Sequence, residues 1–206
     1  NIVLHKNANV GFNGDVSAGV SYEKNAQFNS GLNLNYRNGK FNLYSNYSNT
    51  IAKNANYGTI FREGDNSTQF FDMLNDRKSH LLKVGLDVYL NDKNTLSVFT
   101  SQNSFKGEPG GNINIVYADD MSRNLMQDFG ADMDNYSQQY NFDYKLDFEK
   151  EGHNIEFEAD YNTFDAEEDT FFDFTGTTPL SDYEDFVDTE RDRTTLNLDY
   201  VNPLSE

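Results

Sequence analysis

The chain contains no cysteine and no tryptophan, and only 3 of its 206 residues are proline. The missing cysteine excludes a disulfide framework, a thiolate metal site and a cysteine nucleophile. No run of about 18 apolar residues is present, so the sequence predicts no membrane-spanning helix. Basic residues are scarce, with 16 Lys and Arg against 34 Asp and Glu, which gives a formal charge of −18. A chain this acidic is not expected to bind nucleic acid, because phosphates attract a basic surface.

Motifs of catalysis are lacking as well. The three histidines, His5, His80 and His153, have no zinc-site spacing, and no nucleotide-binding or nucleophile motif occurs. The glycine-rich segment at 106–111 is interpreted as part of a loop, because no strand-to-helix context follows it. We therefore expect no enzymatic activity and no bound cofactor.

What the chain has in abundance is alternation of apolar and polar residues, together with 13 Tyr and 17 Phe. From Val10 to Tyr22 the even-numbered residues are apolar or small, whereas the odd-numbered residues are polar or small. Alternation with a period of two predicts a β-strand with two different faces. The Asn38-Gly39 pair between two such runs predicts a hairpin turn. Eight strands are expected on this pattern, in segments 10–22, 28–36, 41–48, 82–90, around 96–98, 136–148, 155–161 and 196–200.

The expected connections differ in length in a regular way. Those at 37–40, 91–94, 149–153 and from 202 onward are short, whereas those at 49–79, 104–135 and 165–194 are long; only 23–27 breaks the alternation. Aromatic residues stand beside the short turns, at Tyr36, Phe41, Phe148 and Tyr200. Short turns, long loops and aromatic girdles are typical of outer-membrane β-barrels. We therefore predict an all-β fold that forms the wall of an antiparallel transmembrane β-barrel. A soluble β-sandwich is the alternative, and it explains the alternation but not the loop lengths.

Five segments resemble the barrel of TonB-dependent receptors, in particular the outer-membrane β-barrel family common in Bacteroidetes. The segments are NIVLHKN (1–7), GDVSAGVSY (14–22), LNLNYRNGKFNLYSNY (32–47), GLDVYLNDKNTL (85–96) and LDYVNPL (198–204). The resemblance implies that residues 1–7 end a plug domain and that residues 8–206 form the N-terminal part of a barrel of about 22 strands. It also implies contact with TonB through a plug region that this chain does not contain.

Two groups of residues are candidate functional sites. The first group is expected to face the lumen of the barrel: Asn33, Asn35, Asn42, Asn46, Asp143, Glu156, Glu158 and Asp160. A polar lumen would serve as a solute path or contact a plug, although any wet barrel interior must be polar. The second group lies in the acidic tract 165–194 and offers oxygen ligands for Ca²⁺, without the spacing of a known calcium loop: Asp165, Glu167, Glu168, Asp169 and Asp173. The alternative interpretation of this tract is a solvated extracellular loop, or a docking site for a cationic partner.

Three functions remain open on the sequence. The leading hypothesis is uptake of a nutrient across the bacterial outer membrane by a TonB-dependent barrel. The others are a non-transporting barrel that scaffolds a larger outer-membrane complex, and a small self-contained barrel that acts as an adhesin. Expected partners are outer-membrane lipid, TonB and possible partner subunits such as a surface lipoprotein.

Overall fold

A computed structural model describes residues 11–176 and 180–204 of the chain. In this part of the chain the fold is all-β, and a single 3-10 turn at Met121–Arg123 is the only helical element. No helix among these residues is long and apolar enough to cross a membrane. The expected plug end at residues 1–7 lies outside the described residues. The strands are β1 (Gly11–Tyr22), β2 (Ala26–Asn38), β3 (Phe41–Arg62), β4 (Ser67–Tyr89), β5 (Asn94–Tyr117), β6 (Leu125–Asp147), β7 (Asn154–Gly176) and β8 (Tyr183–Val201).

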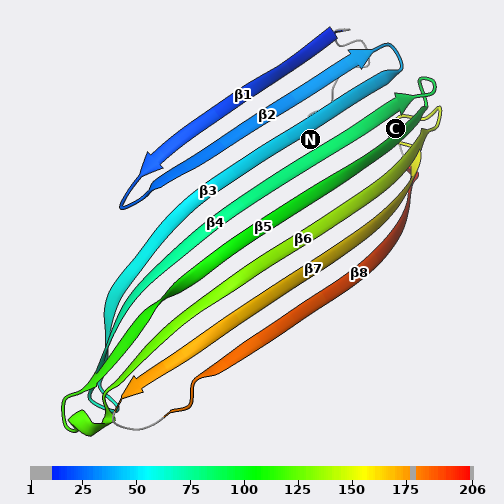
Figure 1. The fold of residues 1–206 in the computed structure, drawn as a ribbon. Helices are drawn as coiled ribbons and strands as arrows, with labels where there is room; N and C mark the ends of the chain where they lie inside the picture. Colours follow the sequence, from blue (N-terminus) through cyan, green and yellow to red (C-terminus); the bar gives the residue numbers. More distant parts are fainter. Residues whose placement is uncertain (1–10, 177–179, 205–206) are drawn as a thin grey trace.

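The eight strands form one antiparallel sheet in which each strand pairs only with its neighbours in sequence (Figure 1). The order β1 to β8 confirms the predicted strand number and the predicted hairpin at Asn38-Gly39. The sheet is open, so β1 and β8 are both edge strands. β1 and β2 are short and end well before the far ends of β3 to β8.

The register places every predicted apolar face on one side of the sheet. Phe12 pairs with Tyr36, Tyr36 pairs with Leu43, and Leu43 pairs with Leu86. Following the pairs across the sheet, even-numbered residues of β1, β2, β4, β5, β6 and β8 share a face with odd-numbered residues of β3 and β7. Because side chains alternate across a strand, the remaining residues form the other face.

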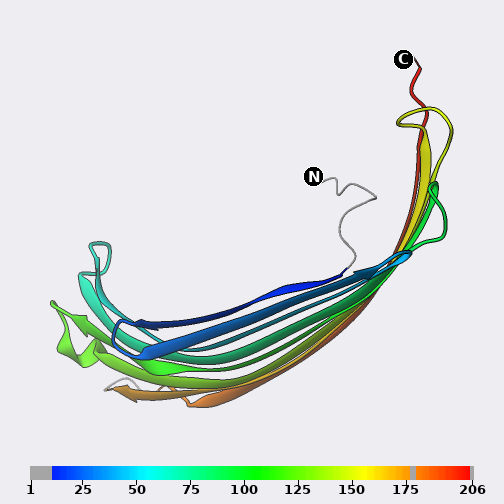
Figure 2. The same cartoon turned by 90° about the horizontal axis from the view of Figure 1, so that it is seen from above.

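The sheet is bent into a curved shell with a concave and a convex side (Figure 2). The most enclosed side chains, Ala52 and Ser67 at 1% and Asn141 at 8% exposure, all lie on the second face. The most exposed apolar side chains of the strands, such as Val16 at 79%, lie on the first. Curvature crowds the side chains of the inner face and spreads those of the outer. We therefore name the first set the convex face and the second set the concave face.

The long connections predicted from the sequence are wrong. Segments 49–79, 104–135 and 165–194 are not loops, because β3 to β8 continue through most of each segment. The actual connections at this end of the sheet are 63–66, 118–124 and 177–182. In segments 104–135 and 165–176 the prediction failed because most apolar residues lie on the opposite face, which interrupts the pattern when one face alone is followed. In segment 49–79 it failed because apolar residues occur on both faces, so the alternation is irregular. We call these parts of β3 to β8 the extension.

The glycine-rich segment at 106–111, interpreted as a loop, lies inside β5. Its Pro109 has no N–H to donate, and pairing with β6 is interrupted at residues 108 and 109. A Cβ atom on Gly111 would lie 2.2 Å from the carbonyl oxygen of Asp72 on β4. Glycine is needed there because β4 and β5 approach too closely for a side chain.

Candidate functional site

An apolar band crosses the convex face at the end of the sheet that carries the short turns at 39–40, 90–93 and 148–153. Its exposed side chains include Phe12 at 68%, Leu196 at 65% and Leu198 at 67%, far above the exposure of a protein core. A contiguous exposed apolar surface of this extent marks an interface with a membrane or with another protein. The band consists of Phe12, Val16, Val20, Leu32, Leu34, Tyr36, Phe41, Leu43, Tyr47, Leu82, Val84, Leu86, Val88, Leu96, Val98, Tyr140, Phe142, Tyr144, Leu146, Ile155, Phe157, Ala159, Tyr161, Leu196, Leu198 and Tyr200.

Aromatic rings border the band on both sides. Near the short turns, the His153 ring lies between Phe148 and Tyr200, with centroid distances of 4.2 Å and 5.4 Å. On the other border, Tyr47 hydrogen-bonds to His80. On β6 the distance from Tyr136 at this border to Leu146 is about 33 Å along the strand at about 3.3 Å per residue. Strands tilted by about 40°, as in outer-membrane barrels, would give this length a height of about 25 Å, the height of the apolar band in those barrels.

Beyond this border, the chemistry of the two faces is exchanged on β5 to β7, whereas β3 and β4 keep exposed apolar side chains such as Tyr57 and Phe70 on the convex face. On the convex face a charged row crosses five strands, in the order Lys78, Lys106, Asp134, Glu167 and Asp188. On the concave face, apolar side chains replace the polar ones of the band level. They include Phe71, Met73, Phe105, Ile113, Phe129, Met133, Phe164, Phe172, Phe174 and Tyr183. Several of these rings stack, and the Phe172 and Tyr183 centroids are 4.6 Å apart.

All eight residues predicted to face a lumen lie on the concave face, behind the apolar band. On β1 to β4 the amides form chains that end on carboxylates. Asn46 donates to Asn33, which donates to Asp15, and Asn35 donates to Asn42, which donates to Asp87. These hydrogen bonds are formed among polar side chains alone, so this half of the concave face is a polar surface that suits contact with water. That it faces a lumen stays a prediction.

The predicted carboxylates on β6 and β7 form a shelf on the same face. Asp143 pairs in register with Glu158, and Asn141 donates to both Glu158 and Asp160 at 3.1 Å and 3.0 Å. The ammonium of Lys145 lies 3.7 Å from the Glu156 carboxylate. Hydrogen bonds from amides and one cation hold this acidic shelf together.

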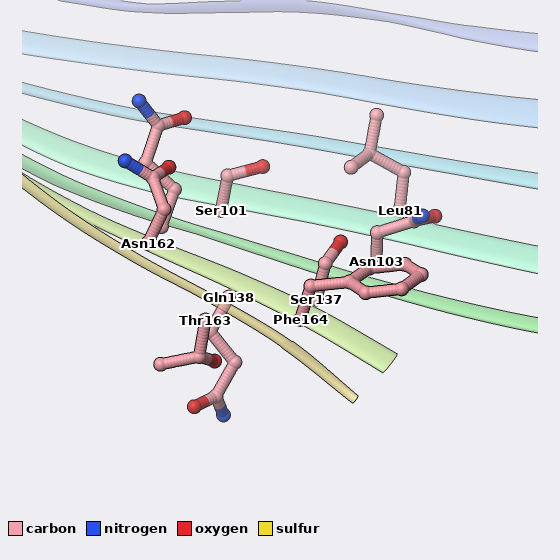
Figure 3. Close-up of a pocket in the computed structure, with 9 residues that line it drawn as sticks. Leu81, Ser101, Asn103, Ser137, Gln138, Asn162, Thr163 and Phe164 are labelled. Carbon is pink, nitrogen blue, oxygen red and sulfur yellow. The ribbon is translucent and has the colours of Figure 1, made fainter. Parts of the chain in front are cut away.

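A hollow of about 490 Å³ opens on the concave face where the polar level meets the apolar level. Figure 3 shows Ser101, Asn103 and Phe164 on one side of the sheet, whereas Gln138 and Thr163 point to the other. The concave side chains of the hollow are Leu81, Ser101, Asn103, Ser137, Gln139, Asn162 and Phe164. None of them was singled out as a site residue from the sequence. The sequence does contain a signal for them. Asn162 and Phe164 alternate with Tyr161 and Thr163, which indicates that β7 continues beyond residue 161, where it was predicted to end.

The five candidate metal ligands do not converge. They lie along β7, and Glu168 points to the concave face whereas the other four lie on the convex face. Among the residues that the structure describes, no group of three His, Cys, Asp or Glu side chains could hold a metal ion. The tract forms a β-hairpin instead of a loop, and its carboxylates face other carboxylates. Three on β6, four on β7 and four on β8 share the convex face: Asp128, Asp132, Asp134, Asp165, Glu167, Asp169, Asp173, Glu184, Asp188, Glu190 and Asp192.

One cation borders this acidic convex surface. The Lys106 ammonium forms an ion pair with Asp134. The hydrogen bond from Lys106 to Asp134, together with the negative charge there, raises the pKa of Lys106 above its ordinary value. Several convex pairs across β6, β7 and β8 join like charges, for example Asp132 with Asp169 and Asp165 with Glu190. Like charges directly opposite each other destabilise a sheet.

No profile of a known protein family matches this chain, and no curated protein matches it significantly.

Proposed function

We propose that this chain forms part of the wall of a bacterial outer-membrane β-barrel that takes up a nutrient with energy supplied through TonB. The observation that carries the barrel is the apolar band, bordered by aromatic rings, on the convex face of a sheet whose concave face is polar behind the band. The convex face contacts lipid in this proposal, and the concave face lines the lumen. The five segments that resemble TonB-dependent receptors support the uptake role.

The open sheet fits this proposal better than a small self-contained barrel. A membrane-spanning sheet must have no free edge in lipid, because unpaired backbone groups are costly there. β1 and β8 are edge strands that do not pair with each other. Further strands must therefore complete the barrel, as the resemblance to a barrel of about 22 strands implies. No enzymatic activity is part of the proposal.

Cysteine labelling of intact cells tests the barrel and its orientation. We expect Met121→Cys and Ser181→Cys, in the connections of the extension, to react with a membrane-impermeant maleimide. We expect Asn38→Cys, in a short turn, to react only after the cells are lysed, because that turn faces the periplasm. Labelling of all three in intact cells would contradict a transmembrane wall. Labelling of Asn38→Cys alone would show that the orientation in the membrane is opposite to the proposed one.

The energy coupling needs a separate test on the full-length protein. We expect in-cell cross-linking to join it to TonB, and deletion of TonB to abolish accumulation of the solute. A protein that never cross-links to TonB does not act as a TonB-dependent transporter, even where the labelling supports the barrel.

A scaffolding barrel is the second candidate, and the acidic convex surface of β6 to β8 favours it. This surface stands beyond the apolar band, where a partner subunit with a basic face could dock. Purification from solubilised outer membranes would then recover the same basic partner with the wild type. Replacement of Asp165, Glu167 and Asp169 by their amides would release it. Recovery that does not change with the amide variant would remove the support for this candidate.

A further inference from the structure

The hollow of Figure 3 combines two kinds of side chain in adjacent rows of the sheet. One row contributes the polar groups of Ser101, Gln139 and Asn162. The next row, toward the extension, contributes Leu81 and the ring of Phe164 beside Asn103 and Ser137. At about 490 Å³ the hollow is large enough for a small organic molecule. Its lining offers both hydrogen bonds and an apolar surface to one ligand.

The charged residues within these two rows have one sign. Lys83 pairs in register with Ser101 at one end, and Arg193 pairs with Asn162 at the other. Arg191 pairs with Phe164. From β4 to β8 no carboxylate occurs in either row. The nearest carboxylate of the acidic shelf, Asp160, belongs to the next row toward the short turns and accepts a hydrogen bond from Gln139. The two rows therefore form a cationic level of the concave face that borders the acidic shelf.

Arg191 is placed to bind an anion. Its guanidinium carbon lies 4.5 Å from the centroid of the Phe164 ring. A guanidinium that stacks on a ring uses its flat face, so the N–H donors at its edge stay available. Those donors form a planar fork that matches a carboxylate.

We propose that the hollow binds an organic anion with an apolar ring or chain. The carboxylate of this ligand meets Arg191 and Arg193, the apolar part packs on Phe164 and Leu81, and the amides of Asn103 and Asn162 bind its remaining polar groups. The inference rests on the proposed function, because a solute reaches the concave face only where that face lines a lumen. It adds the chemical class of the solute, which the barrel itself does not define.

Three probes separate the contributions of charge and apolar surface. They are 4-phenylbutyrate, its neutral isostere 4-phenylbutyramide, and butyrate, which lacks the ring. We expect equilibrium dialysis against the full-length protein in detergent micelles to show 4-phenylbutyrate binding about tenfold tighter than either of the others, because a charge-assisted fork and ring packing are each lost in one of them. Equal affinity for the acid and the amide would overturn the proposal.

Variants locate the binding on the chain. Arg191→Gln should lower the affinity for 4-phenylbutyrate to that for the amide, and Phe164→Ala should weaken both phenyl probes. Arg191→Lys keeps the charge but loses the planar fork, so its affinity should be intermediate. Arg62→Gln is the matched control, because Arg62 lies on the same face at the far end of β3, where it donates to Gln69. Wild-type affinity in Arg191→Gln, or equal losses in Arg191→Gln and Arg62→Gln, would refute the site.

The binding assay is independent of lipid and of TonB. Suppose that binding in micelles is charge-selective but that Met121→Cys and Asn38→Cys label identically in cells. This result would support the site and refute the barrel. The reverse result, correct labelling without charge selectivity, would keep the barrel and refute the anionic ligand. Heat-modified migration of each variant, which reports a folded barrel, ensures that a loss of affinity is not a loss of fold.

Discussion

On β5 to β7 the two halves of each strand, the apolar band and the extension, have opposite chemistry on each face. On β7 the convex side chains are Ile155, Phe157 and Tyr161 in the band, and then Asp165 and Glu167 in the extension. The backbone and the pairing register continue through the change without a break. The difference teaches that the backbone hydrogen bonding of the sheet does not determine which face is apolar. In the proposed barrel, the convex face of the band contacts lipid and the convex face of the extension contacts water.

The largest expected effect is a charge in the middle of the band. Val84→Arg or Phe157→Arg should cost about 2–4 kcal/mol of folding free energy in lipid, because the guanidinium would lie in hydrocarbon. Folding yield in lipid vesicles and urea titration measure this cost. Lys83→Ser, one residue from Val84 on the concave face, should have little effect. Equal losses from Val84→Arg and Lys83→Ser would show that the two faces do not differ.

In the extension of β7 and β8, a polar substitution should cost more stability on the concave face than on the convex face. Phe172 stacks between Phe129 and Tyr183 on the concave face, whereas Phe186 on the convex face is 66% exposed. Phe172→Ser should destabilise the β7–β8 hairpin by about 1–2 kcal/mol through lost burial and ring contacts. Phe186→Ser should change little. The rate of protease cleavage in the hairpin measures the destabilisation in both variants. A larger effect of Phe186→Ser would contradict a concave apolar face in the extension.

A smaller effect is expected where like charges face each other. Glu167 pairs in register with Asp134 and Asp188, so Glu167→Lys turns two repulsive pairs into attractive ones. We expect a gain of about 0.5–1 kcal/mol at low salt, which decreases as salt is added. Glu168→Lys is the control, because Glu168 pairs with Met133 and Val187 on the concave face. An equal gain in the two variants, measured by urea midpoints, would argue against cross-strand repulsion.

The smallest effect concerns the turn that ends the extension between β3 and β4. Ser67 donates a hydrogen bond to Asp65 at 2.7 Å, and this bond holds the pKa of the Asp65 carboxyl below its ordinary value of 3.8. The stabilisation is therefore present above the ordinary pKa and is lost as the pH falls through the lowered one. Hydrogen exchange at residues 63–66 should show wild type better protected than Ser67→Ala at pH 5, with the difference shrinking toward pH 2. A difference that persists at pH 2 would exclude the carboxylate.

The band could be predicted from the sequence, and the extension could not. In segments such as 82–90 and 155–161 the expected faces agree with the register, because regular alternation there reports a single apolar face. At Thr163 and Phe164 the apolar residues change sides, so the signal stops although β7 continues to Gly176. The hollow lies at this transition: Arg191 was assigned to a loop, and Phe164 was assigned neither to the strand 155–161 nor to the loop 165–194. The eight predicted lumen residues share one face, whereas the candidate metal ligands are divided between two.

The pairing of each strand with its sequence neighbours has a consequence for assembly. The turns that the structure describes in full are short, so each strand that they join closes only a small loop and loses little chain entropy beyond its own ordering. The sheet can therefore grow by successive addition of hairpins, with each hairpin templated on the edge left by the previous one. Of the strands described, β8 is the last in this order, and in the proposed larger barrel its Tyr183–Val201 edge is the template for the next strand.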